Sequence, residues 1–382
     1  MYICPMIVRE LSELIEKRLF TGKAIIILGA RQVGKTTLLR QIVSARNEQV
    51  MWLNGDEQDV QLLFQNASTD RFKSFFGKAR LVVLDEAQRI PNIGLRLKLI
   101  TDGIPEIQLL VSGSSSFDIS NALNEPLTGR KWEFKLFPLS FQEMVRATNL
   151  LYESRLLSHR LVFGYYPDVV NHPGDEVEVL SQLVESFLYK DILMLDQLKK
   201  SEAVVKLLRA LAFQIGSQVS YNELGQLCGL SSKTVEKYID VLEKAFVIFK
   251  IGSFSRNLRN ELKKSHKIYF YDVGVRNALI SQFALIENRS DQGPLWENFI
   301  IAERMKFLHY QRRKVNCWFW RTTDQAEVDW IEEENGELRA FEFKYNSNST
   351  AQLSKKFRTT YPEAQQMVVS PSNMNEFLTD RN

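Results

Sequence analysis

Three apolar runs near the N-terminus have the pattern of strands that are buried on both faces. They span residues 24–28, 81–84 and 107–111 and are rich in aliphatic, largely β-branched residues, as expected for a parallel sheet that is covered by helices. Residues 38–43 repeat apolar side chains at helical spacing. This part of the chain is therefore predicted to be an α/β unit with a parallel sheet.

The pattern becomes mainly helical from residue 138 to about residue 200, and two shorter helices follow. Residues 220–223 have the form of a capping box, Gly229 can end that helix, and residues 231–232 can cap the next. Residues 248–251 and 267–271 have strand character. This order is typical of a helix-turn-helix with a wing.

Beyond residue 292 the pattern again mixes a helix with strands. We expect a helix over residues 295–308 and strands over residues 317–321, 326–331 and 341–344. The chain is thus predicted to have four parts: a parallel-sheet core (1–138), a helical lid (139–200), a winged-helix-like domain (201–272) and a C-terminal α/β domain (273–382).

A phosphate-binding loop follows the first apolar run. The stretch Gly29-Ala30-Arg31-Gln32-Val33-Gly34-Lys35-Thr36 matches G-x-x-x-x-G-K-[ST] between a strand and a helix. In such a loop, the backbone N–H groups up to that of Thr37 face the phosphates. Lys35 reaches the β/γ-phosphates, and Thr36 binds Mg²⁺. The sequence therefore predicts Mg-ATP binding here.

Four further residues are candidates for hydrolysis. Asp85 and Glu86 end the second apolar run, where Asp85 can hold Mg²⁺ and Glu86 can polarise water; the alternative is a pair of capping acids. Ser114, in the polar tip 112–116 after the third run, can sense the γ-phosphate, although a glycine-serine turn explains it equally well. Arg130 can stabilise transition-state charge in cis or across a subunit contact, unless it is a surface arginine.

The composition excludes several classes of protein. Hydrophobic residues make up 45 % and charged residues 25 % of the 382 residues, which argues against disorder and fibrous repeats. Three scattered cysteines and four scattered histidines favour neither disulfides nor a zinc site. No stretch approaches the roughly 20 apolar residues of a membrane span. We therefore expect a cytoplasmic protein with no membrane partner.

The net charge of +3 identifies no partner, but the charge is unevenly distributed. Residues 201–267 contain 11 basic and 6 acidic residues, a net +5, which suits contacts to DNA phosphates. Arg256, Arg259, Lys263 and Lys264 lie in the predicted wing. The second helix also carries Glu236, Asp240 and Glu243, so a winged helix that acts only as a structural linker remains the alternative.

Acidic residues and a lysine converge in the C-terminal part. If Asn335-Gly336 forms a two-residue hairpin turn, Asp329 lies opposite Glu342, at a Cβ separation of roughly 5 Å. Glu342 and Lys344 share one face of their strand. Asp329 and Glu342 can then hold Mg²⁺, with Lys344 activating water and Glu297 approaching from the helix. A surface hairpin with exposed ion pairs is the alternative.

These motifs, in this order, resemble the prokaryotic AAA+-type ATPases of unassigned role that carry a C-terminal domain similar to PD-(D/E)xK nucleases. The resemblance rests on the phosphate loop, on the tips at residues 84–86 and 114–116, and on Gly129-Arg130. It also includes the Pro-Leu-Ser-Phe segment at 138–141 and the order Glu297, Asp329, Glu342-Phe343-Lys344. It implies an AAA+-like core with a helical lid, a possible homo-oligomer through that core, and a restriction-endonuclease-like C-terminal domain.

Two functions follow from these expectations. The first is ATP hydrolysis coupled to a DNA-directed, nuclease-like module. The second is an ATP-controlled protein-interaction switch with a catalytically inactive nuclease-like domain. Metal binding by the C-terminal part distinguishes them, because only the first function requires it.

Overall fold

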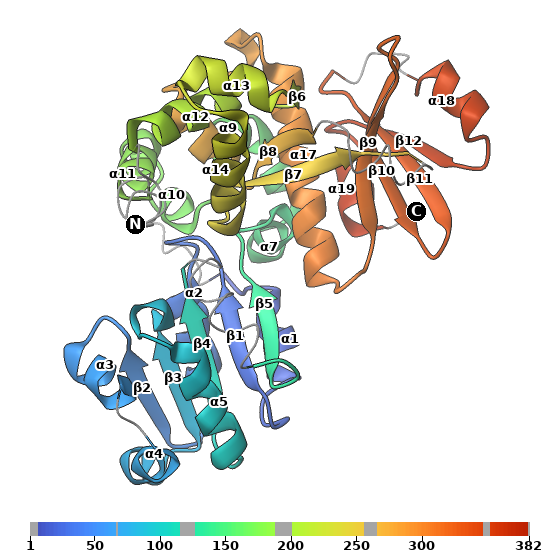
Figure 1. Cartoon of the computed structure of the whole chain (residues 1–382). Coiled ribbons are helices and arrows are strands. Elements are labelled where there is room, and N and C mark those ends of the chain that lie inside the picture. The colour runs from blue at the N-terminus through green and yellow to red at the C-terminus, as the bar shows by residue number, and fades with distance from the viewer. Residues whose placement is uncertain are drawn as a thin grey trace. The chain divides into compact units, whose positions relative to one another are not determined.

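Two sheets organise the chain: a parallel sheet of five strands in the N-terminal part and a mixed sheet of seven strands in the remainder (Figure 1). The structure is a computed structural model that describes residues 7–65, 68–114, 127–187, 201–255, 266–346 and 352–380. It divides into two units. The first comprises Met1–Leu139 with Lys244–Phe246, and the second comprises Ser140–Glu243 with Val247–Asn382.

The first sheet has the strand order β2-β3-β4-β1-β5, and all neighbouring strands are parallel. Its strands are β1 (Ala24–Leu28), β2 (Val50–Asn54), β3 (Leu81–Asp85), β4 (Gln108–Gly113) and β5 (Lys131–Lys135). The three predicted runs are β1, β3 and β4, which are buried throughout; β2 was not predicted. Because these strands are parallel, their carboxyl ends lie at one edge of the sheet, where ligands of α/β folds bind.

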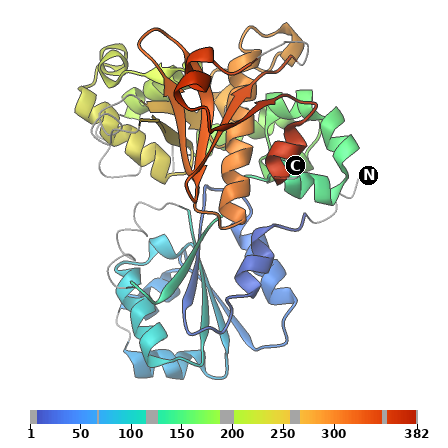
Figure 2. The same cartoon turned by 90° about the vertical axis from the view of Figure 1, so that its right-hand side faces the viewer.

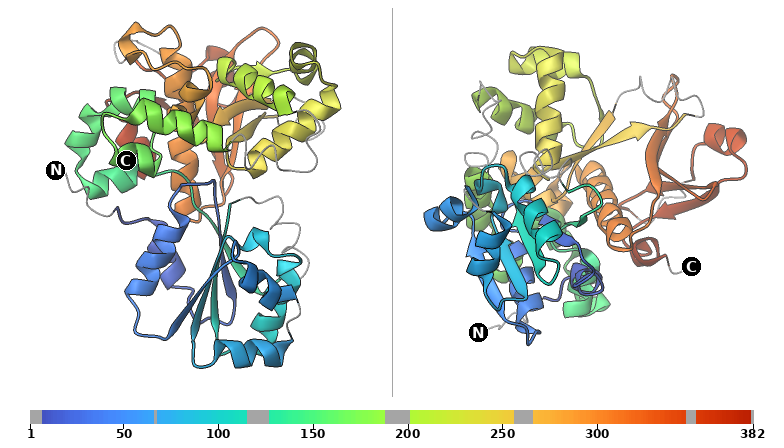
Figure 3. Two further views of the ribbon diagram at one scale, coloured as in Figure 1. Left: turned by 90° about the vertical axis from the view of Figure 1, so that its left-hand side faces the viewer. Right: turned by 60° about the horizontal axis from the view of Figure 1, so that its bottom comes forward.

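Helices lie on both sides of this sheet, as Figures 2 and 3 show from opposite directions. They are α1 (Leu11–Glu16), α2 (Lys35–Ser44), α3 (Gln58–Gln65), α4 (Thr69–Phe76) and α5 (Ile93–Gly103), with a short 3₁₀ turn η1 (Ala87–Arg89) after β3. Covering both faces explains why β1, β3 and β4 are buried at every position rather than at alternate positions.

The seven-stranded sheet of the second unit has the order β12-β11-β10-β9-β7-β8-β6. Its strands are β6 (Gln218–Val219), β7 (Ile248–Ser253), β8 (His266–Phe270), β9 (Asn316–Arg321), β10 (Glu327–Glu334), β11 (Glu337–Phe343) and β12 (Gln365–Val369). Parallel pairing of β7 with β9, at Gly252 opposite Trp318 and Ser253 opposite Phe319, joins its two halves. The predicted boundary between residues 272 and 273 therefore falls within one continuous sheet.

The helices of the second unit precede and follow these strands. They are α7 (Phe141–Ala147), α8 (Leu150–Arg155), α9 (Leu157–Phe163), α10 (Pro167–Asn171), α11 (Glu176–Phe187), α12 (Ser201–Phe213), α13 (Tyr221–Cys228), α14 (Ser232–Lys244), α16 (Val273–Leu279), η3 (Ile286–Asn288), α17 (Gln292–Tyr310), α18 (Lys355–Thr360) and α19 (Met374–Thr379). Ser220 caps α13 and Gly229, with φ of 68°, ends it, as predicted. No helix in the described ranges is both long and apolar enough to cross a membrane.

Candidate functional site

The phosphate loop joins the carboxyl end of β1 to the amino end of α2 and needs glycine at two positions. Gly34 has φ of 94°, in the left-handed region that favours glycine. At Gly29, a Cβ atom would lie 2.2 Å from the carbonyl oxygen of Leu136, so a side chain there would clash with the backbone. The two glycines of the motif therefore shape the loop.

Lys35 begins α2 and folds its side chain back into the loop. It is only 5 % exposed, and its Nζ donates to the carbonyl oxygens of Gly29 at 2.9 Å and Ala30 at 2.8 Å. The ammonium group thus lies inside the loop, beside the N-terminus of α2, where backbone N–H groups attract anions. Of the remaining loop residues, Val33 is buried, Arg31 and Thr36 are half-buried, and Gln32 and Thr37 are exposed.

Arg9 supports the phosphate loop, although no sequence motif identified it. Its side chain is buried, and it donates to the carbonyl oxygens of Val33 and Phe137, each at 2.6 Å. A single arginine before the first strand carries no sequence signal of its own. In the structure it ties the phosphate loop to the segment that leaves β5.

Asp85 and Thr36 meet at the carboxyl edge of the sheet. The Thr36 hydroxyl donates to Asp85 Oδ2 at 2.7 Å, and Asp85 Oδ1 accepts from the Ser112 hydroxyl and from the backbone N–H of Glu86 at 3.2 Å. Hydroxyl and carboxylate oxygens are the ligands that Mg²⁺ prefers. The two predicted ligands therefore fit a magnesium ion at this position.

Glu86 has a left-handed backbone conformation, with φ of 52° and ψ of 41°, which is uncommon for a residue with a side chain. Gly55 of the neighbouring segment packs against it, because a Cβ atom at Gly55 would lie 2.4 Å from the Glu86 carbonyl oxygen. The Gln88 side chain donates to the Glu86 carboxylate and, at 2.9 Å, to the Ser114 hydroxyl. Gln88 was not predicted, although its position two residues after Glu86 marked it as a neighbour.

Arg130 lies at the opposite edge of the first sheet. It precedes β5, whose first residue Lys131 pairs with Ala24 at the amino end of β1, and its side chain bonds Asp102 at 2.5 Å. The phosphate loop follows the carboxyl end of β1, five residues away, or roughly 16 Å along a strand. A role for Arg130 in cis is therefore wrong, because parallel pairing separates it from the phosphates.

Several predicted positions lie outside the described residues. They are Ser115 and Ser116 of the polar tip, and the wing residues Arg256, Arg259, Lys263 and Lys264.

Two acids of α14 are engaged within the protein. The negative charges of Asp240 and Glu243 argue against contacts between this helix and DNA phosphates. In the structure, Lys250 of β7 pairs with both carboxylates, at 2.5 and 3.1 Å. Burial alone would lower the pKa of Lys250, and these carboxylates outweigh burial and raise it. Lys233 and Lys237 are exposed on the same helix. Two of its three acids are thus paired with one lysine, which offsets part of their negative charge.

The C-terminal hairpin has the register that its Asn-Gly turn predicts. In the antiparallel pair β10 and β11, Trp330 lies opposite Phe341, and continuing this register sets Asp329 opposite Glu342. Lys344 Nζ donates to Glu342 Oε1 at 2.7 Å. Glu342 and Lys344 therefore share one side of the strand, as predicted.

Glu297 does not join these residues in the predicted way. Its Oε1 accepts from Lys267 Nζ at 2.9 Å and from the Tyr269 hydroxyl at 2.6 Å. Lys267, only 2 % exposed, also pairs with Glu327 at 2.5 Å. Within the described ranges, no three His, Cys, Asp or Glu side chains form a group that could hold a metal ion. The three-carboxylate metal site is therefore not assembled, because a buried lysine from β8 engages Glu297.

Charge repulsion and burial act together on the two remaining carboxylates. Burial raises the pKa of Asp329 well above its ordinary value, and nearby Glu297 and Glu342 raise it further. Burial also raises the pKa of Glu342, against the opposing effect of Lys344. Glu342 Oε2 is buried and has no hydrogen-bond partner among the described residues. This environment favours binding a cation or a proton.

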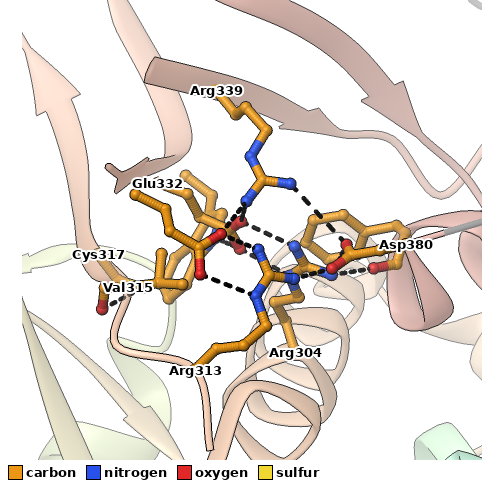
Figure 4. A network of polar contacts seen from close by, with 10 residues as sticks. Arg304, Arg313, Val315, Cys317, Glu332, Arg339 and Asp380 are labelled. Atoms are coloured by element: carbon orange, nitrogen blue, oxygen red, sulfur yellow. Dashed lines mark hydrogen bonds and ion pairs between the residues drawn. The ribbon is translucent and has the colours of Figure 1, made fainter. Parts of the chain in front are cut away.

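Asp329 and Glu342, with Glu297 nearby, are called the acidic site below. A buried ion-pair network connects α17 and β10, which carry Glu297 and Asp329 (Figure 4). Arg304 of α17 forms a two-pronged bond with Glu332 of β10, at 2.6 and 2.7 Å, and bonds Asp380 after α19 at 2.6 Å. Both side chains of the Arg304–Glu332 pair are fully buried. Since Glu297 is on α17 and Asp329 is on β10, this pair fixes their relative position.

Comparisons with protein families divide the chain into three matched segments. Residues 21–145 match a model described as an AAA domain, residues 154–285 match "Domain of unknown function (DUF8612)", and residues 292–382 match "Domain of unknown function (DUF4143)". The first match covers the phosphate loop, Asp85 and Glu86. This part of the chain is therefore similar to AAA domains.

Uncharacterized relatives in bacteria match most of the chain. An uncharacterized protein of Haemophilus influenzae is 28 % identical over 359 residues, covering 86 % of this chain and 85 % of its own. An uncharacterized protein of Mycobacterium tuberculosis is 25 % identical over 361 residues, covering 94 % and 78 %. The similarity extends through both units and is not confined to the AAA domain.

Similarity to solved structures is slight. A STAND protein with a tetratricopeptide repeat sensor from Pyrococcus horikoshii matches 80 % of this chain and 47 % of its own, with 13 % identity and a TM-score of 0.32. The Pif1 helicase of Candida albicans matches 46 % and 48 %, with 14 % identity and a TM-score of 0.27. The chain spans about half the length of these proteins, and scores this low support no functional conclusion.

Proposed function

We propose that the first unit binds Mg-ATP and hydrolyses it, and that this controls a DNA-directed second unit. The observation that carries the proposal is the 2.7 Å hydrogen bond between Thr36 and Asp85. It brings the hydroxyl of the phosphate loop and the carboxylate of β3 together, as a shared magnesium ion requires.

Each residue of the site has a role in this proposal. Lys35 and the loop N–H groups bind the phosphates, Ser114 contacts the γ-phosphate, and Glu86 orients and polarises the attacking water. Thr36 and Asp85 hold Mg²⁺, which neutralises charge on the phosphates. The buried sides of the site then exclude other water.

Two substitutions test binding and hydrolysis separately. Lys35→Ala should weaken Mg-ATP binding, measured by isothermal titration. Glu86→Gln should keep ATP bound but slow its turnover by about 100-fold or more, the usual loss when a general base is removed. Unchanged affinity in the first variant, or a parental rate in the second, would remove the residue concerned from the proposed mechanism.

We further propose that the winged-helix-like part of the second unit contacts DNA through α14. Lys233 and Lys237 are exposed, and Lys250 pairs with Asp240 and Glu243 and offsets part of their charge. Each lysine contact to a phosphate lost by substitution with alanine should flatten the slope of log affinity against log salt by about one unit. Equal slopes for the parent and the Lys233→Ala/Lys237→Ala variant would show that neither lysine contacts a DNA phosphate.

A homo-oligomer through the AAA-type unit remains part of the proposal. Arg130 is 40 % exposed on its side chain and pairs only weakly with solvent-exposed Asp102, so it can serve the site of a neighbouring copy. Sedimentation with a slowly hydrolysed ATP analogue tests assembly. A strictly monomeric protein, or a fully active Arg130→Ala variant, would contradict this role.

The acidic site of the second unit supports two outcomes. In the first, Asp329 and Glu342 bind Mg²⁺ and Lys344 activates water for phosphodiester cleavage, as in a PD-(D/E)xK-like nuclease. In the second, the nuclease-like domain is inactive and docks a protein partner under ATP control; the engagement of Glu297 by Lys267 favours this alternative. DNA cleavage by the full chain with Mg²⁺ or Mn²⁺, with and without ATP, decides between them.

A further inference from the structure

Gln88 has a side chain whose two ends are both engaged. Its Nε2 group donates to the carboxylate of Glu86 and to the hydroxyl of Ser114 at 2.9 Å. Its Oε1 accepts from the backbone N–H of Ser114 at 3.4 Å. The reversed amide would place its NH₂ against that N–H, so the partners define one orientation of the side chain.

The NH₂ group of Gln88 donates one hydrogen bond to Ser114 and one to Glu86, and so links the two side chains. The Ser114 hydroxyl accepts from Gln88, and a hydroxyl that accepts a bond keeps one hydrogen to donate to an anion. The same amide group of Gln88 directs its second hydrogen to Glu86. If the Ser114 hydroxyl shifts toward a phosphate, the Gln88 amide that bonds it shifts too. The Glu86 carboxylate, which accepts from the same amide, is then reoriented.

The backbone of Glu86 gives its side chain few alternatives. Its left-handed conformation is held by N–H bonds to Asp85 and Ser112 and by close packing of Gly55. With the backbone held, the direction of the carboxylate depends on its side-chain torsions and on the partner that restrains them. Gln88 is that partner in the structure.

We infer that Gln88 is a positioning residue that couples contact of the γ-phosphate with Ser114 to the orientation of Glu86 toward the attacking water. This inference rests on the proposed ATPase function. Gln88 itself touches neither water nor phosphate in this scheme. It makes hydrolysis conditional on a complete triphosphate, because only the γ-phosphate reaches Ser114.

The test uses the full chain and measures kcat, KM and ATP affinity. Gln88→Met keeps a similar volume but removes every hydrogen bond, and Ser114→Ala removes the other end of the relay. We expect each to lower kcat by about 10- to 100-fold, the usual effect of a misdirected catalytic group, with ATP affinity unchanged. The double variant should be no slower than the slower single variant, because both break one relay.

Arg89→Ala is the matched control. It changes the next residue of the same turn, which is exposed and pairs with Asp56 at 3.1 Å, and it should keep the parental kcat. A parental kcat for Gln88→Met, or multiplicative losses in the double variant, would overturn the inference. So would a loss of ATP affinity equal to the loss of kcat, because that indicates a purely structural role.

Glu86→Gln in the same series separates this inference from the proposed function. If that variant is inactive and Gln88→Met is fully active, only the relay is wrong. If Glu86→Gln turns over ATP at the parental rate, Glu86 is not the base, and the relay is excluded together with the proposed mechanism. Gln88→Ala replaces Gln88→Met if the methionine variant does not fold.

Discussion

Replacing Arg304 by methionine should destabilise the second unit and disturb its acidic site. The guanidinium group makes both bonds to Glu332 and also bonds Asp380 and the carbonyl oxygen of Phe377. Without it, Glu332 remains fully buried with Trp330 at 2.9 Å and a longer contact to Arg339 at 3.5 Å. One buried carboxylate would then lack its main counter-charge.

The expected loss is about 3–5 kcal/mol, which is typical when one partner of a buried ion pair is removed. For a unit of this size, each kcal/mol corresponds to about 2–4 °C in Tm, so the melting point of the second unit should fall by roughly 6–20 °C. Replacing both residues, Arg304→Met with Glu332→Leu, should recover much of this loss, because no unpaired charge stays buried.

Tryptophan fluorescence measures this change in the second unit. Four of the six tryptophans, Trp296, Trp318, Trp320 and Trp330, are in that unit. Since the two units need not unfold together, hydrogen exchange of α17 and β10 should accompany the melting curve. Arg312→Met provides a control on an exposed arginine near the end of α17.

The same pair predicts a loss of stability in acid. Burial alone would raise the pKa of Glu332, but hydrogen bonds from Arg304 outweigh burial and lower it. A carboxyl group with a lowered folded pKa stabilises the protein above its unfolded pKa, near 4.3, and loses that contribution as the pH falls through the folded pKa. Arg304→Met should remove this loss. A variant with parental melting and parental acid stability would refute the role of the network.

Three other substitutions follow from close contacts. Gly29→Ala should abolish measurable Mg-ATP binding in titration, because its Cβ atom would lie 2.2 Å from the carbonyl oxygen of Leu136. Gly164→Ala should lower the free energy of unfolding of the second unit by about 1–3 kcal/mol, measured by thermal melting, since φ is 72° and the Cβ atom would lie 2.2 Å from Asp272. Lys250→Met should weaken DNA binding in a salt titration, because it leaves two carboxylates of α14 unneutralised.

Local patterns were sufficient to predict several elements of both sites. The phosphate loop is contiguous, so its strand, glycines and helix are all readable within residues 24–43. The hairpin register was predictable for the same reason, since a two-residue Asn-Gly turn determines which residues face each other. The observed register, from Trp330 opposite Phe341 to Glu334 opposite Glu337, is the one that this turn predicts.

Contacts between distant segments were not predictable in this way. The sequence of β7 does not reveal that it pairs with β9, about 65 residues later. Nor does the sequence of β8 reveal that Lys267 contacts Glu297 of α17. Arg130 was misassigned because its distance from the loop depends on strand direction. Parallel pairing of β5 with β1 leaves it at the opposite edge of the sheet.

The continuous sheet also changes how the acidic site must be studied. The isolated segment from residue 291 onward would lack Lys267 and Tyr269, the two partners of Glu297. In that fragment Glu297 would be released toward Asp329, and metal binding would report an altered site. The full chain is therefore the appropriate sample for metal titrations.

Arg9 gives the last prediction, which concerns communication from the phosphate loop. Its guanidinium group bonds Val33 in the loop and Phe137, three residues before the second unit begins at Ser140. The Leu136 carbonyl packs on Gly29 at the other end of the loop. A loop that adjusts to ATP therefore acts on the connecting segment at two points.

Arg9→Met should consequently weaken ATP binding and, more specifically, remove the effect of ATP on hydrogen exchange at residues 136–139. Arg18→Met is the control, because Arg18 is exposed and contacts the Trp132 ring at 4.3 Å, away from the loop. If ATP still protects residues 136–139 in the Arg9 variant at saturating nucleotide, the loop reaches the connection through Leu136 alone. Loss of that protection with ATP still bound would instead assign the coupling to the buried arginine, because a guanidinium group with two carbonyl partners transmits displacement that a methionine cannot.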